Sequence, residues 1–443
     1  MSVVPLSPAV LTQLASTRPA VTEAPQLHSA LRSRRLLLLK ALRIRVQRGH
    51  DDLDPASYER FVDAWRLLER IERQRPAIVR DVLDYPTTGT WLATALAAPT
   101  VALLAEHLAR WEAIAATAAL RAGCPLDRYV AAPRGALSLT GVGRLGTGAE
   151  GPAAEGSGAA GPAAEGAGAE RARVRVRGRT ALIGVGGARV RGAVLVTKGR
   201  HTHAVGPGRR WEAVRALPGG TALLDDLDPY RVPPGGVGNP PRRASERTVG
   251  DFPLWAARWR AAHALLSRTD PGRAAETARA VRIVVPLAAG DSGPIGATLR
   301  SAPGAVLTTL PGTAQELAET LVHEAHHGKL AALHELVPLY DPAHGAVHRV
   351  GWRSDPRPIS GVLQGAYAHL ALTDLWRRAA SGGGLPTPWR SRAGQQFERF
   401  HDQVGGALEI LLESDELTSA GREFAHRMHR HHASLGATRG AVE

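Results

Sequence analysis

Apolar positions toward the N-terminus follow a helical spacing. Over residues 27–125, aromatic and aliphatic side chains recur three and four positions apart, as in Phe61, Trp65, Leu68 and Ile71. This spacing gathers apolar side chains on one face of a helix and predicts a packed core rather than a cofactor site. We therefore expect residues 1–141 to form a mostly helical N-terminal region.

The periodicity changes further along the chain. Residues 173–177 alternate Arg and Val at a period of two, and residues 189–197 and 211–217 continue in the same manner between Gly-rich turns. Alternation of this kind predicts a small antiparallel sheet, which makes 171–240 a β-rich region.

The segment 142–170 separates these two regions. It contains Gly-Pro-Ala-Ala-Glu-Gly at 151–156 and again at 161–166. Such Gly/Ala/Pro repeats cannot bury a core, so the segment is interpreted as a linker or surface insertion.

The remaining residues, 241–443, combine strands with long helices. Short apolar segments at 281–287, 296–301 and 305–310 predict strands. A capping box, Thr313 followed three residues later by Glu316, then opens a long helix that ends before Pro338. The expected fold class is α+β: a helical N-terminal region, a small antiparallel β region, and a zincin-like helix-plus-strands catalytic region with C-terminal helices.

Composition narrows the classes of function. Among 443 residues, the single Cys124 rules out an internal disulfide and a Cys-based zinc site. The net charge of +14 comes almost wholly from arginines that are spread along the chain, and no nucleic-acid motif accompanies them, so no nucleic-acid partner is expected. The sequence has no apparent secretory signal and no apolar run long enough to span a bilayer, so we expect a cytoplasmic protein without a membrane partner. Its oligomeric state is left open.

The candidate chemistry lies on the long helix, in the H-E-x-x-H sequence of His323, Glu324 and His327. Residues four apart share one helical face, so two imidazoles can bind one metal ion beside a carboxylate. A third ligand is needed, and the extended peptidase form fails because positions 330 and 333 are both leucine. A downstream Glu ligand such as Glu398 lacks a recognisable signature.

Four histidines further along the chain carry a side chain that could serve as the third ligand. His334 lies roughly 10 Å along the helix axis from His327, too far to bind the same ion. His344, His348 and His369 remain candidates. The histidines at 426, 429, 431 and 432 are expected to belong to a solvated C-terminal tail.

Three segments together resemble a known bacterial family. They are Val322-His-Glu-Ala-His-His, then Trp352-Arg-Ser-Asp-Pro-Arg-Pro, then Gly365-Ala-Tyr-Ala. They resemble the HExxH-motif proteins associated with ribosomally made, modified peptides, described as 2-oxoglutarate-dependent (aKG-HExxH-type) peptide β-hydroxylases. The resemblance covers residues 296–380 closely and is much weaker over 1–290.

The resemblance implies an oxidoreductase that hydroxylates a β-carbon in a ribosomally made precursor peptide. It implies Fe(II) as the metal, with 2-oxoglutarate and O₂ as cosubstrates. His323 and His327 would bind the iron, with His369 as the favoured third ligand, and Glu324 would orient a ligand or the substrate. Arg353 and Arg357 would hold the distal carboxylate of 2-oxoglutarate, because guanidinium groups bind carboxylates in a bidentate manner.

Competing interpretations stay open at this point. The arginines could instead form a salt bridge with Asp355, and His369 could be a hydrogen-bonded core residue. The same helix also suits a zinc metallopeptidase, with Zn(II) as the metal and Glu324 activating water. A third alternative is a peptide-binding module without catalytic activity.

Overall fold

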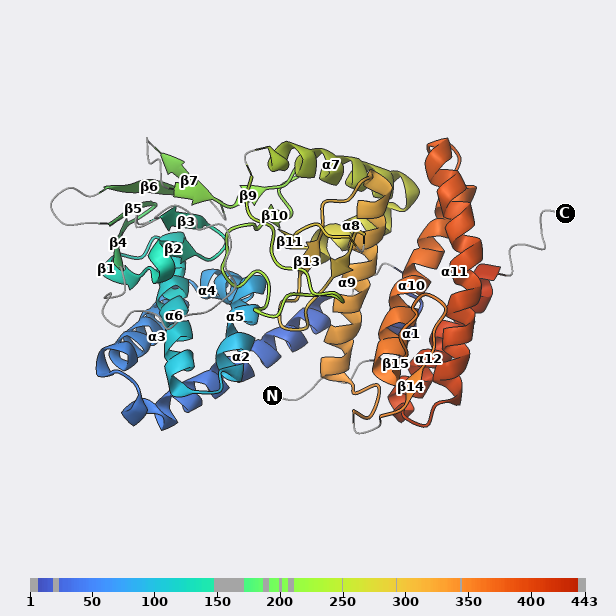
Figure 1. Cartoon of the computed structure of the whole chain (residues 1–443), viewed down its shortest axis with the longest axis horizontal. Coiled ribbons are helices and arrows are strands. Elements are labelled where there is room, and N and C mark those ends of the chain that lie inside the picture. Colours follow the sequence, from blue (N-terminus) through green and yellow to red (C-terminus); the bar gives the residue numbers. More distant parts are fainter. Residues whose placement is uncertain are drawn as a thin grey trace.

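The computed structural model describes residues 7–18, 24–146, 171–185, 191–198, 201–205, 211–248, 250–291, 293–342 and 345–436. Over these residues the fold is mixed α+β, with helices toward both ends of the chain and several small sheets between them, which confirms the predicted class (Figure 1). None of the described helices is long and apolar enough to cross a membrane.

The N-terminal region is helical, as its spacing predicts. Its helices are α1 (Pro8–Ala15), α2 (Ala24–Arg48), α3 (Pro55–Gln74), α4 (Pro76–Leu83), α5 (Pro86–Ala97) and α6 (Val101–Ala122). Asp54 and Thr100 accept hydrogen bonds from backbone amides at the starts of α3 and α6, as N-cap residues do. The aromatic side chains form the core, where Trp91 stacks on Trp111 with ring centroids 5.6 Å apart.

The β-rich part contains two antiparallel sheets. The larger has the order β1 (Leu126–Ala131), β4 (Arg171–Arg177), β5 (Thr180–Val185), β6 (Arg191–Lys198) and β7 (His201–Val205). The smaller contains β2 (Ala136–Leu139), β3 (Gly143–Gly146) and β8 (Trp211–Ala213). The prediction of an antiparallel sheet is confirmed.

The N-terminal helices and the antiparallel sheets share one hydrophobic core. Alternate residues of β4, among them Val174 and Val176, are buried in the same cluster as Phe61 and Trp111 of the helices. The tract 142–170 begins within a sheet, because β3 pairs with β2, and its residues 147–170 lie outside the described residues.

A third, mixed sheet supports the candidate site. Its order is β12 (Gly296–Ala297), β13 (Ala305–Thr308), β11 (Ile283–Pro286), β10 (Leu223–Leu224) and β9 (Arg215–Ala216). β10, β11 and β13 are parallel, while β12 runs antiparallel at the edge. The three predicted strands are present, although only two residues of 296–301 are in strand conformation. Helices α7 (Asp251–Thr269) and α8 (Pro271–Ala280) precede β11.

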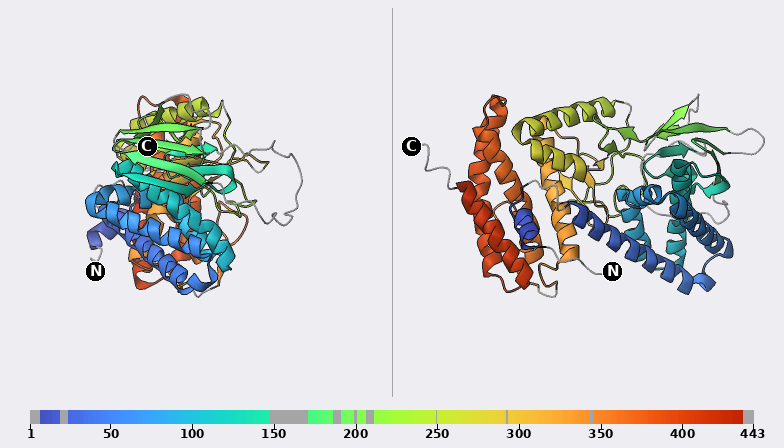
Figure 2. Two further views of the ribbon diagram at one scale, coloured as in Figure 1. Left: turned by 90° about the vertical axis from the view of Figure 1, so that its left-hand side faces the viewer. Right: turned by 180° about the vertical axis from the view of Figure 1, so that it is seen from behind.

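Helix α9 (Ala314–Leu336) begins at the predicted capping box. The Glu316 amide donates to Thr313 Oγ1 at 3.1 Å, and the Glu316 carboxylate accepts from the Gly312 amide at 2.9 Å. α9 lies between the mixed sheet and a layer of C-terminal helices at one end of the molecule (Figures 1 and 2). These helices are α10 (Ile359–Ser381), α11 (Thr387–Glu413) and α12 (Ser419–Gly436), and β14 (Val347–His348) pairs with β15 (Arg357–Pro358) before them.

The expectation of a solvated histidine tail holds for His426 and His429, which are exposed on α12, and is wrong for the other two histidines. His431 and His432 are buried in α12 against the neighbouring helices. The helical periodicity of this segment was hidden by its high content of Arg and His.

Candidate metal centre

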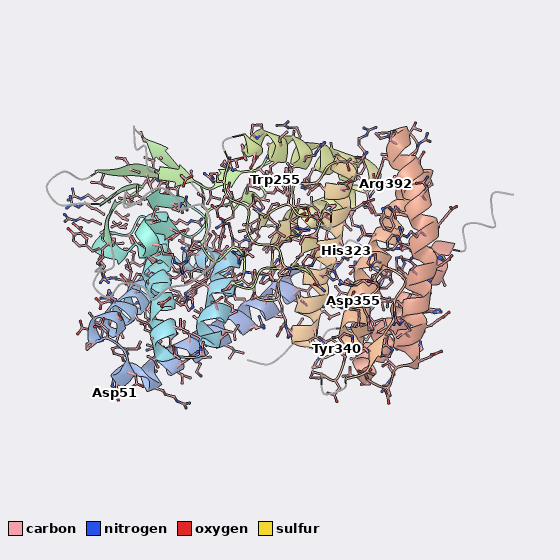
Figure 3. The ribbon with its side chains drawn as sticks, viewed as in Figure 1. Asp51, Trp255, His323, Tyr340, Asp355 and Arg392 are labelled. Carbon is pink, nitrogen blue, oxygen red and sulfur yellow. The ribbon has the colours of Figure 1, made fainter. Side chains whose placement is uncertain are left out.

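His323 and His327 lie one turn apart in the middle of α9. Figure 3 labels His323 on this helix. The Nε2 atoms of the two histidines are 3.0 Å apart, and their rings meet edge to face. Ligand atoms of His323, Glu324 and His327 all lie within 4.8 Å of one another, a group that could hold a metal ion, and no other such group occurs among the described residues. The helical spacing of the motif therefore brings the three groups together.

Both imidazoles suit a metal because they are held uncharged. His327 Nδ1 lies 3.1 Å from Gln364 Oε1 of α10. Because an amide oxygen only accepts hydrogen bonds, Nδ1 carries the proton and donates it to Gln364. The tautomer that results leaves a lone pair on Nε2. Burial lowers the pKa of His327; burial and then the neighbouring His327 and His369 hold the pKa of His323 well below 6.5.

His369 packs beside this pair from α10. Its ring centroid is 4.9 Å from that of His323, and the ring is stacked between Trp352 and Phe400. His369 Nδ1 lies 2.9 Å from the Gly365 carbonyl, to which it donates, so its Nε2 carries the lone pair. Burial lowers its pKa to about 4. His369 is not a member of the group within 4.8 Å, so its role as third ligand stays a prediction.

Glu324 lies on the flank of α9 that faces the edge strand β12. It is 5% exposed, its Oε2 has no hydrogen-bond partner, and burial raises its pKa to about 8. A methyl group built onto Gly296 would lie 2.9 Å from Glu324 Oε1, so the strand backbone passes very close to this carboxyl. A metal cation bound by the nitrogens of His323 and His327 would favour the ionised form of the Glu324 carboxyl.

Arg353 and Arg357 are both paired with Asp355. Arg353 Nε lies 2.8 Å from Asp355 Oδ1, and Arg357 Nη1 lies 3.3 Å from Asp355 Oδ2. Hydrogen bonds from Arg353 in particular lower the pKa of Asp355. All three side chains are about 40% exposed, so the alternative salt bridge is what the structure contains, and a role in cosubstrate binding stays a prediction.

Two residues to which the sequence assigned no role, Trp352 and Gln364, complete the surroundings of the histidines. Trp352 stacks on His369 and lies against Gly365, where a Cβ would be 2.8 Å from its ring. Gln364 orients His327, as noted above. Trp352 begins one of the segments that carry the resemblance and Gln364 directly precedes another, but their periodicity alone gave no reason to assign them a role.

The other candidate third ligands are engaged elsewhere or undescribed. His348 lies 3.4 Å from Glu416, and His334 accepts a hydrogen bond from the Leu339 amide. His344 lies outside the described residues.

His326 belongs to a buried network on another face of α9. Its Nδ1 donates to the Val322 carbonyl at 2.8 Å, and its Nε2 accepts from Arg273 of α8 at 3.0 Å. Arg273 also donates to Asp374 of α10 at 3.0 Å, and both of these side chains are fully buried. Burial lowers the pKa of His326 to about 3. The network fixes α8, α9 and α10 against one another beside the metal group.

Comparison with known proteins adds no family. No protein-family model matches the chain, and no curated protein matches it. Inference about function therefore depends on the residues of the site and of the segments around it.

Proposed function

We propose that the protein is an Fe(II)- and 2-oxoglutarate-dependent dioxygenase that hydroxylates a β-carbon in a ribosomally made precursor peptide. The observation that carries the proposal is the convergence of two uncharged imidazole nitrogens, 3.0 Å apart, beside the Glu324 carboxyl. The resemblance of residues 296–380 to HExxH-type peptide β-hydroxylases supplies the reaction class.

The separation of the two nitrogens allows one metal ion to bind both. Two nitrogens that each lie about 2.1 Å from one ion are about 3.0 Å apart when they subtend a right angle, and about 3.4 Å apart in a tetrahedron. The 3.0 Å between the Nε2 atoms of His323 and His327 is close to both values and is also the length of a hydrogen bond between the two rings. Fe(II) held by two histidines and one further ligand would keep positions for a keto acid and O₂.

Each residue has a defined part in this proposal. His323, His327 and a third ligand, His369, hold the metal, and Glu324 orients a ligand or the peptide from its position beside β12. The free edge of β12 can pair with an extended peptide through its backbone groups. Fe(II) with its cosubstrates supplies the oxidising power: a C–H bond, O₂ and 2-oxoglutarate become C–OH, succinate and CO₂.

The test is anaerobic reconstitution of the full chain with Fe(II), followed by addition of 2-oxoglutarate, O₂ and a candidate precursor peptide. Mass spectrometry should show a gain of one oxygen in the peptide with an equal amount of succinate. His323→Ala should abolish both products, and His334→Ala, on the same helix, should retain them. Hydroxylation that persists in His323→Ala would overturn the assignment of this helix.

A zinc metallopeptidase is the second candidate. It is favoured by the antiparallel edge strand beside an H-E-x-x-H helix and by the closeness of Glu324 to both histidines, since this carboxylate would then activate water. In the same experiment, peptide cleavage with Zn(II), without succinate, would select this alternative.

A further inference from the structure

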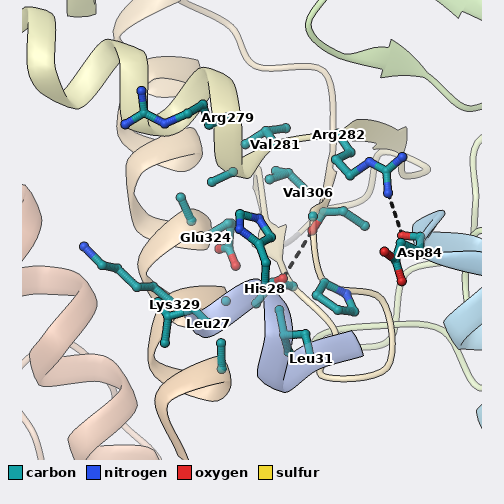
Figure 4. A pocket seen from close by; sticks show the side chains of 18 of the residues that line it. Leu27, His28, Leu31, Asp84, Arg279, Val281, Arg282, Val306, Glu324 and Lys329 are labelled. Atoms are coloured by element: carbon teal, nitrogen blue, oxygen red, sulfur yellow. Dashed lines mark hydrogen bonds between the residues drawn. The ribbon is translucent and has the colours of Figure 1, made fainter. Parts of the chain in front are cut away.

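A cavity of about 210 Å³ lies beside α9 (Figure 4). By helix geometry, most of the α9 residues that line it lie on the face opposite His323 and His327. Ala325, Gly328 and Ala332, spaced three and four residues apart, line it from α9. Helices α2 and α8 and strand β13 form its other walls. Glu324 is the one residue of the metal group that also lines the cavity.

The walls of the cavity are mainly apolar. Leu27 and Leu31 of α2 face Val281 and Val306 across it (Figure 4). A cavity of about 150 Å³ with apolar walls holds benzene, so this one has room for a ring or a branched chain with a few further atoms.

Charge at the cavity favours an anion. Two of its basic residues are neutralised: Lys329 lies 2.7 Å from Glu276, and Arg282 lies 2.6 Å from Asp81. A third, Arg35, donates to backbone carbonyls. In contrast, Arg32 lines the cavity from α2 and has no ion-pair partner among the residues that the structure describes, while the side chain of Arg279 is exposed and points away from the cavity (Figure 4).

A second polar feature lies inside the cavity. Glu324 is 5% exposed, and its Oε2 is buried without a hydrogen-bond partner. A buried polar atom without a partner costs free energy, and a ligand that bears a hydroxyl or amide group would remove that cost.

We propose that this cavity binds a small carboxylic acid with a ring-sized apolar body and a hydrogen-bonding group at its far end. The apolar body fills the space between α2 and α9, the carboxylate pairs with Arg32 of α2, and the far group pairs with Glu324. The site is separate from the histidine pair and does not depend on the proposed oxygenase function. Through Glu324, its occupant would contact the one residue that the two sites share.

The first test uses 4-hydroxyphenylacetate as the probe and the full chain without metal, in a calorimetric titration. Saturable binding with a dissociation constant below about 1 mM is expected. Gly328→Leu should abolish it, because a Cβ at this position meets only open space and a longer side chain would enter the cavity. Gly328→Ala is the matched control and should still bind, since both substitutions favour the helix.

The second test concerns the anionic group. Arg32→Gln should weaken binding of the probe about tenfold, as loss of a charge-assisted hydrogen bond does, and so should replacing the probe by its neutral amide. Arg48→Gln, an exposed arginine of α2 outside the cavity, is the control and should bind as the parent does. Absence of saturable binding at about 10 mM, or equal binding by Gly328→Leu, would overturn the proposal.

The metal site is assayed independently, by titrating the same variants with Co(II). A protein that binds Co(II) but not the probe refutes the cavity site and leaves the proposed function standing. A protein that binds the probe but neither Co(II) nor Fe(II) supports the cavity site and refutes the proposed function.

Discussion

At the scale of single residues, three histidines within five positions have two different roles. His323 and His327 face α10, and their Nε2 atoms meet 3.0 Å apart where one metal ion could bind both, whereas both ring nitrogens of His326 are occupied by hydrogen bonds to Val322 and Arg273. The difference follows from helix geometry, because a residue one position from His327 points about 100° away from it. His326 is therefore a structural residue, and Arg273 is its buried partner.

Replacing Arg273 by Met should destabilise the protein by about 3–5 kcal/mol, because Asp374 and His326 would lose a buried partner. Urea unfolding measures this change. The double variant Arg273→Met/Asp374→Leu should recover part of the loss, because it removes a buried carboxylate whose one remaining ion pair is with the partly exposed Arg378. A loss below about 1 kcal/mol in the single variant would contradict the importance of this network.

The roles of Arg353 and Arg357 in cosubstrate binding can also be tested by single substitutions. If either leaves Asp355 to bind the cosubstrate, its replacement by Ala should raise the KM for 2-oxoglutarate about tenfold or more and leave the KM for peptide nearly unchanged. Asp355→Asn is the control, since it removes the salt bridge and leaves both guanidinium groups in place. Unchanged dependence on 2-oxoglutarate in both arginine variants would remove them from the cosubstrate pocket.

At the scale of elements, the edge strand β12 and helix α9 define the approach to Glu324. The strand runs so close to the helix that a side chain at Gly296 would collide with Glu324 Oε1 and Thr320 Cγ2, each 2.9 Å from the added Cβ. A side chain fits at this position only if Glu324 or Thr320 shifts. The sequence predicted the strand and the helix separately, but their contact depends on how the sheet packs.

Gly296→Ala should therefore displace Glu324, lower stability by roughly 1–3 kcal/mol and weaken metal binding. Urea unfolding and titration with Co(II) measure the two effects. Gly394→Ala in α11, where a Cβ would meet nothing within 4 Å, should leave metal binding unaltered and stability unchanged or slightly higher. Equal behaviour of the two variants would show that β12 does not constrain Glu324.

At the scale of the whole molecule, a buried polar cluster joins the N-terminal core to the mixed sheet. Tyr85 donates to Asp225 at 2.7 Å, and Thr87 donates to Asp228 at 2.7 Å, while Arg110 of α6 pairs with Asp228. Asp225 directly follows β10. Burial, and next the charge of Asp228, raise the pKa of Asp225 to about 6.

This raised pKa has a defined effect on stability. Between about pH 4 and pH 6 the folded protein binds more protons at Asp225 than the unfolded chain does, so this group makes stability fall as the pH rises. In Asp225→Asn that contribution is absent, so the stability of the variant relative to the parent should increase from about pH 4 to pH 7 and then stay level. Urea unfolding over this pH range measures the difference, with the exposed Asp51→Asn as control. A difference that is independent of pH would contradict the raised pKa.

The sequence by itself determined those features that depend on local spacing. The helical N-terminal region, the antiparallel strands, the capping box of α9 and the meeting of His323 with His327 all follow from periods of two and of three to four residues. The boundary between 1–141 and 171–240 was harder to predict. Strand β1 from the first segment pairs with β4 from the second, and both contribute to one hydrophobic core.

Only the tertiary structure decided what depends on contacts between distant segments. It brought Gln364 to His327, stacked His369 between Trp352 and Phe400, and set Glu324 between a strand edge and a cavity. These partners lie on elements whose order in space is set by burial of the whole core, which no local pattern of the chain encodes. Spacing along one helix thus specified the histidine pair, and packing between helices determined its surroundings.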